Sequence, residues 1–196
     1  MSEEIPNVDV PEGKSGVWRV ERFTVSADDI RLHNLRCAIK PGMGNRMMKE
    51  GAYTRLVRGS EIVMSDTHAE KRDHIAPVRM AKGVILLNGL GLGMVLNACL
   101  LKPEVEQAIV IEASDDVIAL VADHYKGKFP GRVDILKADA LDYQPPKGVR
   151  FGMVWHDIWD GICSDNLRDM TKLHRRYGVK ADWQGSWCKE LCKWGR

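Results

Sequence analysis

The uncharged stretch of residues 84–101 is the feature that most constrains how this chain folds. It opens with an apolar run, continues with Gly89, Gly91 and Gly93 at alternate positions, and closes with a second apolar run. This order is typical of a strand, a tight turn and a helix at the ligand-binding edge of a parallel sheet. The stretch therefore predicts a unit that holds a nucleoside-bearing ligand. Glycine also marks plain turns, which are the alternative at this point.

A membrane span is another interpretation of so long an uncharged stretch. Three glycines and two asparagines divide it, however, and Pro103 follows it closely. We therefore expect a short strand and a short helix instead of a transmembrane segment. Residues 1–6 also lack the basic start and apolar core of a signal peptide. The sequence predicts a cytoplasmic protein with no membrane partner.

The spacing of the glycines indicates which ligand to expect. A dinucleotide site has the pattern G-x-G-x-x-G, whereas this turn has G-x-G-x-G, with Met94 in the final place. No Lys or Arg lies between Lys82 and Lys102 to meet a phosphate. A ligand with adenosine and a carboxylate but no phosphate fits better, and S-adenosylmethionine has this composition.

Glu112 ends the next predicted strand, residues 108–112. It follows Gly93 by 19 residues, close to the offset at which an acidic side chain meets ribose hydroxyls in nucleotide-binding units. The alternative is an ordinary acid that precedes a helix, because Ser114 and two aspartates follow as cap and first-turn residues.

Two further predicted strands deliver carboxylates to the same edge of the sheet. Residues 133–137 lead to Asp139, which could accept a hydrogen bond from an adenine amino group, and residues 151–156 lead to Asp157. Open parallel sheets bind their ligands at the carboxyl ends of their strands. We therefore expect Gly, Glu, Asp and Asp side by side at one binding edge.

Residues 51–165 resemble the class I S-adenosylmethionine-dependent methyltransferase fold, and within it the spermidine synthase-like branch. The resemblance implies that the glycine loop lies against the methionine part of the cofactor, that Glu112 binds ribose and that Asp139 binds adenine. It implies a cofactor-binding set of Asn88, Gly89, Leu90, Gly91, Gly93, Glu112, Ala113, Asp139, Ala140 and Asp157, and no metal.

The resemblance to spermidine synthases rests on two segments. Asp157-Ile158-Trp159-Asp160 keeps both acids of their Asp-Ser-Ser-Asp-Pro-like run at the same separation. Residues 53–66, with His74 and Pro77 after them, resemble the strand–turn–strand and helix that lead into the domain. Asp157 is expected to contact the aminoacyl part of the cofactor or the acceptor, while His74 and Asp66 are outer candidates.

The expected fold class is α/β: a Rossmann-like class I methyltransferase fold, with a mostly parallel sheet, helices on both faces and a small N-terminal β-containing extension. Enzymes of this fold add about three strands after the fourth, but only some 30 residues follow Asp165 here, and they suggest helices. The sheet would thus lack its usual last strands. The N-terminal strands or another subunit would complete it.

We expect four regions. They are a flexible arm (1–16), an N-terminal strand, loop and helix extension (17–80), the cofactor-binding core (81–165) and C-terminal helices (166–196). Residues 18–25 alternate as a half-exposed strand, and residues 40–46 suggest a mobile loop. Ser164 or Asp165 should cap a helix that stops at Gly178, and Asp182 another. One face of that last helix is expected to cover the open edge of the sheet or to form a homodimer surface. The residues on this face are Trp183, Trp187, Leu191 and Trp194.

Charge is uneven, although the whole chain carries only +2. Residues 31–58 hold seven Lys or Arg against one acid, and residues 168–196 hold eight against three. These regions are either solvated helix faces or a positive surface for an acidic acceptor or nucleic acid. No recognised nucleic-acid motif is present, which disfavours the latter. Cys188 and Cys192 lie four apart without a second pair, so helix packing is expected there instead of a metal site.

The predicted function is methyl transfer from S-adenosylmethionine to an unidentified acceptor. The sulfonium is already activated, so the protein must align the acceptor, exclude water and in some cases remove a proton. Asp157 is the first candidate for that base, followed by His156 and Asp160; a structural role for His156 is the alternative. Two other functions stay open: aminopropyl transfer from the decarboxylated cofactor, and a non-catalytic binding or assembly protein.

Overall fold

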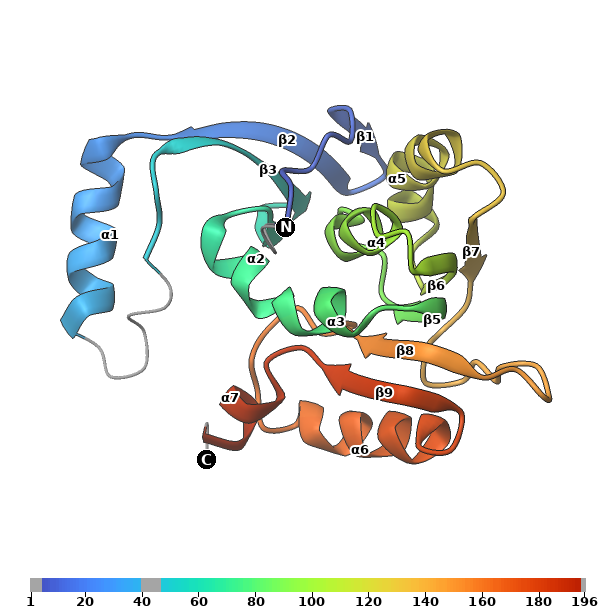
Figure 1. Ribbon diagram of the computed structural model, residues 1–196. Helices are drawn as coiled ribbons and strands as arrows, with labels where there is room; N and C mark the ends of the chain where they lie inside the picture. The colour runs from blue at the N-terminus through green and yellow to red at the C-terminus, as the bar shows by residue number, and fades with distance from the viewer. Residues whose placement is uncertain (1–4, 40–46, 195–196) are drawn as a thin grey trace.

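The computed structural model describes residues 5–39 and 47–194, without the side chains of Leu32, His33, Arg36 and Cys37 (Figure 1). The predicted loop at 40–46 lies outside the described residues. Two sheets form the molecule, and they share one hydrophobic core that contains Val20 and Leu56 from one and Leu87 and Val110 from the other.

The N-terminal sheet is an antiparallel meander of four strands in the order β1-β2-β3-β4. Residues 18–25 form the predicted strand, and residues 53–66 the predicted strand–turn–strand. Helix α1 joins β2 to the segment before β3 and stands away from the rest of the molecule (Figure 1). The elements are β1 (Gly13–Ser15), β2 (Trp18–Val25), α1 (Ala27–Ile39), β3 (Gly51–Arg58) and β4 (Glu61–Ser65).

The second sheet is fully parallel, with five strands in the order β7-β6-β5-β8-β9. The chain starts in the middle at β5, moves outward to β7, and returns to the other side of β5, as in a Rossmann-like doubly wound sheet. The expected Rossmann-like α/β class is confirmed. The strands are β5 (Gly83–Asn88), β6 (Val105–Glu112), β7 (Val133–Lys137), β8 (Phe151–His156) and β9 (Ala181–Ser186).

Helices cover both faces of this sheet. The larger core cluster joins α4 and α5 to one face through Leu96 and Val121, and the smaller one joins α6 to the other through Leu173 and Tyr177. Ser114 caps α5 as predicted, since its side chain accepts a hydrogen bond from Val117 N. The helices are α2 (His68–Asp73), α3 (Ile75–Met80), α4 (Met94–Leu100), α5 (Asp115–Lys128), α6 (Asn166–Tyr177) and α7 (Lys189–Trp194).

The prediction of helices alone after Asp165 is wrong for residues 181–186. Helix α6 forms, but Asp182 lies in strand β9, which extends the sheet beyond β8. Residues four apart share a face in a helix and in a strand alike, so the spacing of Trp183 and Trp187 fits both structures. Within the described residues, the only helix that follows β9 is α7, which begins at Lys189.

The N-terminal segment also differs from the flexible arm that composition suggested. Val8 and Val10 are buried in the main core. The buried carboxylate of Asp66 accepts hydrogen bonds from Val8 N at 2.8 Å and Thr54 N at 2.6 Å. Asp66, an outer site candidate, therefore holds this segment against β3.

Candidate functional site

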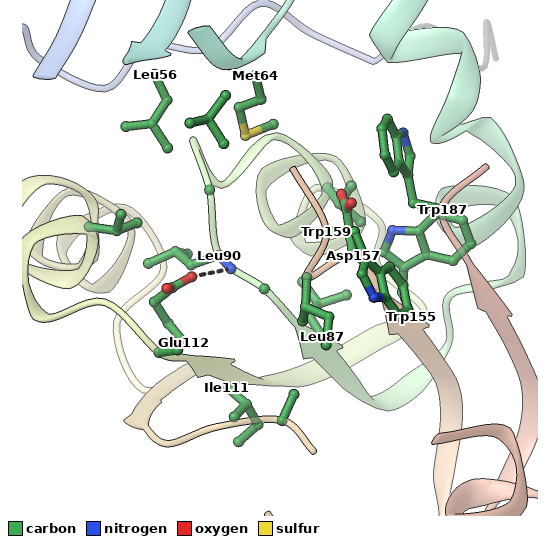
Figure 2. Close-up of a pocket in the computed structure, with 18 of the residues that line it drawn as sticks. Leu56, Met64, Leu87, Leu90, Ile111, Glu112, Trp155, Asp157, Trp159 and Trp187 are labelled. Atoms are coloured by element: carbon green, nitrogen blue, oxygen red, sulfur yellow. Dashed lines mark hydrogen bonds between the residues drawn. The ribbon is translucent and has the colours of Figure 1, made fainter. Parts of the chain in front are cut away.

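A pocket of about 490 Å³ lies at the carboxyl ends of the parallel strands. The turn after β5, the ends of β6 and β8 and the loop after β7 surround it, and Leu56 and Met64 of the N-terminal sheet cover it (Figure 2). The residues of the predicted cofactor-binding and catalytic sets that line it are Gly89, Leu90, Gly91, Glu112, Ala113, Asp139, Ala140, Asp157 and Asp160, and the outer candidate His74 lines it too.

The glycine turn is closely packed against two other segments. A Cβ on Gly89 would overlap the backbone oxygen of Asp157, and one on Gly91 would overlap the Met64 sulfur. Both glycines have positive φ, which other residues adopt only at a cost. Leu92 N also donates a hydrogen bond to the Met64 sulfur at 3.1 Å. The turn is thus shaped by packing from both sheets.

Glu112 connects the ends of β5 and β6. One of its carboxylate oxygens accepts a hydrogen bond from Leu90 N at 2.9 Å (Figure 2). The other accepts one from Ser114 N at 2.8 Å. The glycine turn is therefore fixed by the same carboxylate that the sequence assigns to ribose. Each oxygen has a second lone pair, so the group can still accept hydrogen bonds from a ligand.

Asp139 follows β7, the strand that pairs with β6, and it also lines the pocket. One of its carboxylate oxygens accepts a hydrogen bond from Leu141 N at 2.7 Å. The second oxygen has no such partner among the described residues, and the residue is exposed. Ala140 beside it is buried. A carboxylate oxygen next to small apolar side chains can hold an amino-substituted ring.

Asp157 lies at the opposite end, directly after β8. Its Oδ2 is 3.6 Å from Nε2 of the buried His74. Burial, together with the negative charges of Glu70 and Asp73, raises the pKa of Asp157 to about 8. The carboxyl group can therefore exchange a proton near neutral pH, which is a property of general bases.

Asp160 lines the pocket but is bound to a cation. Its Oδ2 lies 2.6 Å from the Arg58 guanidinium, and nearly half of its side chain is exposed. The carboxylate of Asp160 in turn raises the pKa of Arg58. This pair ties the loop after β8 to the end of β3, which leaves Asp160 a weaker candidate for proton removal than Asp157.

His156 and Asn88 do not line the pocket, in contrast to the predicted site. Both side chains are fully buried on the α6 face, where Asn88 Nδ2 lies 2.7 Å from His156 Nδ1. Successive residues of a strand point to opposite faces, and here Trp155 lines the pocket while His156 packs against Tyr177 of α6. Burial lowers the pKa of His156 to about 3. This histidine is a neutral structural residue.

Gly93 also lies away from the pocket lining. A Cβ there would overlap the ring of Tyr125, whose hydroxyl donates to Leu92 O at 3.0 Å. Gly93 precedes α4 with φ of 70°. Its role is to let the chain enter α4 against α5, so the glycine serves helix packing instead of ligand contact.

The aromatic part of the site was not predicted from the sequence. Trp155, Trp159 and Trp187 line the pocket beside Asp157 (Figure 2). Trp155 precedes Asp157 by two residues, so strand periodicity could have placed it on the same face. Glu70, also in the lining, is one helical turn before His74. The Glu70 carboxylate accepts hydrogen bonds from the Ser65 N–H at 2.8 Å and from the Ser65 hydroxyl at 2.9 Å.

The charge of the pocket lining does not favour an acidic acceptor. Among the described residues, its lining contains no Lys or Arg and five carboxylate side chains: Glu70, Glu112, Asp139, Asp157 and Asp160. Such a lining repels anions and attracts cations. The Lys and Arg side chains of the two basic regions, within the described residues, do not line this pocket.

Two further observations concern the described residues as a whole. No group of three or more His, Cys, Asp or Glu within them is arranged to hold a metal ion. None of the helices in these residues combines the length and the apolar character needed to cross a bilayer.

No protein-family model and no curated protein matches this sequence. Among solved structures, one similar protein is provisionally assigned as an RNA methyltransferase from Pyrococcus horikoshii, with 15% identity and a TM-score of 0.47 over 61% of this chain and 57% of that one. A dimethyladenosine transferase from Plasmodium falciparum has 18% identity and a TM-score of 0.41 over 53% and 35%.

An S-adenosylmethionine-dependent methyltransferase from Clostridium acetobutylicum has 9% identity and a TM-score of 0.41, over 55% of this chain and 42% of that one. Similarity at this level concerns the arrangement of strands and helices alone. In each case the matched region spans less than two thirds of the other protein.

Proposed function

We propose that this protein is an S-adenosylmethionine-dependent methyltransferase. The observation that carries the proposal is the convergence of the glycine turn, Glu112, Asp139 and Asp157 around one pocket at the carboxyl edge of a parallel sheet. Its volume of about 490 Å³ lies within the range of small-ligand sites.

The residues of this pocket suit the proposed cofactor. Glu112 would accept hydrogen bonds from the ribose hydroxyls with its remaining lone pairs, and Asp139 would accept one from the adenine amino group. Leu90, Ala113 and Ala140 would pack against the purine. S-adenosylmethionine supplies an activated methyl group, and the protein's part is to align an acceptor and exclude water. Asp157 would take up a proton where the acceptor carries one.

Calorimetric titration tests this proposal. S-adenosylmethionine and S-adenosylhomocysteine should bind saturably and NAD should not. Glu112→Gln should weaken binding by about tenfold or more, because one hydrogen-bond acceptor is replaced by an amide N–H. Glu106→Gln is the matched control, since Glu106 is an exposed acid on the same strand. If neither compound binds the unaltered protein, the proposal fails and a non-catalytic binding protein is favoured.

Aminopropyl transfer is a second candidate, and one observation favours it. The lining that the structure describes offers no Lys or Arg to the carboxylate of S-adenosylmethionine. Two N–H groups of the glycine turn are already engaged, Leu90 N by Glu112 and Leu92 N by Met64. Decarboxylated S-adenosylmethionine needs no such partner. Tighter binding of the decarboxylated compound in the same titration would replace methyl transfer by aminopropyl transfer.

A further inference from the structure

A second cavity lies between the N-terminal segment, the start of β3 and helix α2. Its volume is about 660 Å³, which is within the range of sites for small ligands. None of the described residues that line it also lines the pocket at the parallel sheet. The proposed function therefore gives this second cavity no role.

The charge of the second cavity is opposite to that of the pocket at the parallel sheet. Lys49, Lys71 and Arg72 line the second cavity, and among the described residues of its lining Glu50 is the only acid. The other pocket has five carboxylate side chains and, in the part of the chain that the structure describes, no Lys or Arg. A concave surface with an excess of positive charge attracts anions.

Helix α2 contributes a wall to both cavities and presents a different charge to each. His68, Lys71 and Arg72 are three or four residues apart, so they share one face of the helix, and they line the second cavity. Glu70 follows His68 by two residues, so it points to the opposite side and lines the other pocket. Because Ser65 donates two hydrogen bonds to the Glu70 carboxylate, the direction of each face is fixed.

Asn7 connects the three segments that enclose the second cavity. Its Oδ1 accepts a hydrogen bond from Lys71 Nζ, and its Nδ2 donates one to Ala52 O at 3.5 Å. The ammonium group of Lys71 is therefore oriented by a neutral side chain of the lining. The cations of this cavity thus belong to a wall that is already assembled.

The second cavity also has an apolar wall. The Tyr53 hydroxyl donates a hydrogen bond to Lys49 O at 2.9 Å, so this residue offers its ring to a ligand more readily than its hydroxyl. The buried Ile5 and the half-buried Ile75 line the cavity with it. A ligand that fills the cavity should therefore have an apolar part as well as a negative charge.

A phosphate group suits this set of cations better than a carboxylate does. A phosphomonoester carries nearly two negative charges at neutral pH and has three acceptor oxygens, whereas a carboxylate has one charge and two oxygens. A guanidinium group can bind two phosphate oxygens at once, and ammonium groups add point charges. A nucleic-acid strand has one charge per phosphate, spread along its length, and gains less from cations gathered in one cavity.

We propose that the second cavity binds a small organic phosphomonoester. The phosphate group lies against Lys49, Lys71 and Arg72, and the apolar part of the ligand lies against Tyr53 and Ile75. The inference does not rest on the proposed function, because the described linings of the two cavities have no residue in common.

Calorimetric titration with phenyl phosphate tests this inference. Phenyl phosphate should bind saturably, inorganic phosphate more weakly because it has no apolar part, and benzoate about tenfold more weakly because it has less charge. Lys49→Gln and Arg72→Gln should each weaken the binding of phenyl phosphate by about tenfold. Arg79→Gln is the matched control, since Arg79 is an exposed cation of α3 outside this lining.

Circular dichroism establishes that each variant is folded, and Lys49→Gln changes an exposed side chain that the fold tolerates easily. Arg72→Lys keeps the charge without the paired hydrogen bonds, so its affinity should lie between those of Arg72→Gln and the unaltered protein. No binding of phenyl phosphate, or equal binding by Lys49→Gln, Arg72→Gln and the unaltered protein, would overturn the inference. A single-stranded oligonucleotide that binds more tightly than phenyl phosphate, and is lost in Lys49→Gln, would assign the cavity to nucleic acid instead.

Saturation with S-adenosylhomocysteine separates this inference from the proposed function. The affinity for phenyl phosphate should stay unchanged, whereas competition would place the phosphate in the other pocket and overturn the second site. Binding of phenyl phosphate without binding of S-adenosylhomocysteine would support the second site and reject the proposed function alone.

Discussion

The ring of Tyr125 occupies the space that a side chain on Gly93 would need, so helix α5 packs directly on the backbone at the start of α4. The Tyr125 hydroxyl also donates a hydrogen bond to Leu92 O at 3.0 Å. The glycine turn is therefore held by a tyrosine 32 positions later in the sequence as well as by Glu112.

Gly93→Ala should destabilise the protein by about 2–5 kcal/mol, because it combines an unfavourable left-handed conformation with a clash in a packed core. Urea denaturation measures the change. Gly127→Ala is the control, since Gly127 lies in α5 with no atom within 4 Å of an added Cβ, and helix propensity predicts a slightly more stable variant. Equal stability of Gly93→Ala and the unaltered protein would contradict the packing described.

Asp66→Asn should cost about 2–4 kcal/mol of stability, because an amide N–H then faces a backbone donor in a buried site. Val8 and Thr54 both donate to this carboxylate. Hydrogen exchange should show lost protection at these two amides before the parallel sheet is affected. Asp123→Asn, on the exposed side of α5, should leave stability unchanged. A uniform loss of protection across both sheets would argue against a local anchor.

Asp157→Asn should change how stability depends on pH. The folded protein holds the Asp157 proton up to a pKa of about 8, whereas the unfolded chain loses it near 3.8. Between these values the folded state binds more protons, so the stability of the unaltered protein decreases as pH rises. The variant lacks this contribution, and the stability difference between the two should change across this pH range. A constant difference from pH 4 to pH 8 would show that Asp157 ionises normally.

His156→Gln should reduce the loss of stability in acid. Burial holds the pKa of His156 at about 3, against an ordinary value of 6.5, so only the unfolded chain takes up this proton as pH falls from 6.5 to 3. The unaltered protein therefore loses stability over that range. Denaturation midpoints at several pH values should show a shallower slope for the variant. Parallel slopes would place His156 in a solvated position.

The parallel core could be predicted from sequence because its strands are apolar and clear turn and helix-cap residues separate its elements. Glycines follow β5, and Ser114 caps α5 by accepting the Val117 N–H. Strand β9 could not be predicted in this way. It lies at the edge of the sheet and contains Asp182, Gln184 and Gly185, so it has no run of apolar residues.

The candidate site was predictable only as far as strand ends are concerned. Gly89, Glu112, Asp139 and Asp157 meet at one pocket because parallel strands present their carboxyl ends together. The face of the sheet to which each side chain points was harder to predict. Neighbouring residues of a strand point to opposite faces, and His156 points away from the predicted site. The contribution of Trp187 depends on β9, which brings a residue from near the end of the chain to the pocket.

Met64 and Leu56 cover the pocket from the N-terminal sheet, so the parallel sheet cannot be separated from that sheet without changing the pocket. A fragment that begins at Ala81 would retain all five parallel strands and the glycine turn. It would lose Leu56 and Met64, which cover the pocket. Gly91 and Leu92, which contact the Met64 sulfur in the intact chain, would then lose that partner. Solubility and affinity for any ligand of this pocket should therefore decrease together on truncation, because the antiparallel strands form one wall of the candidate pocket.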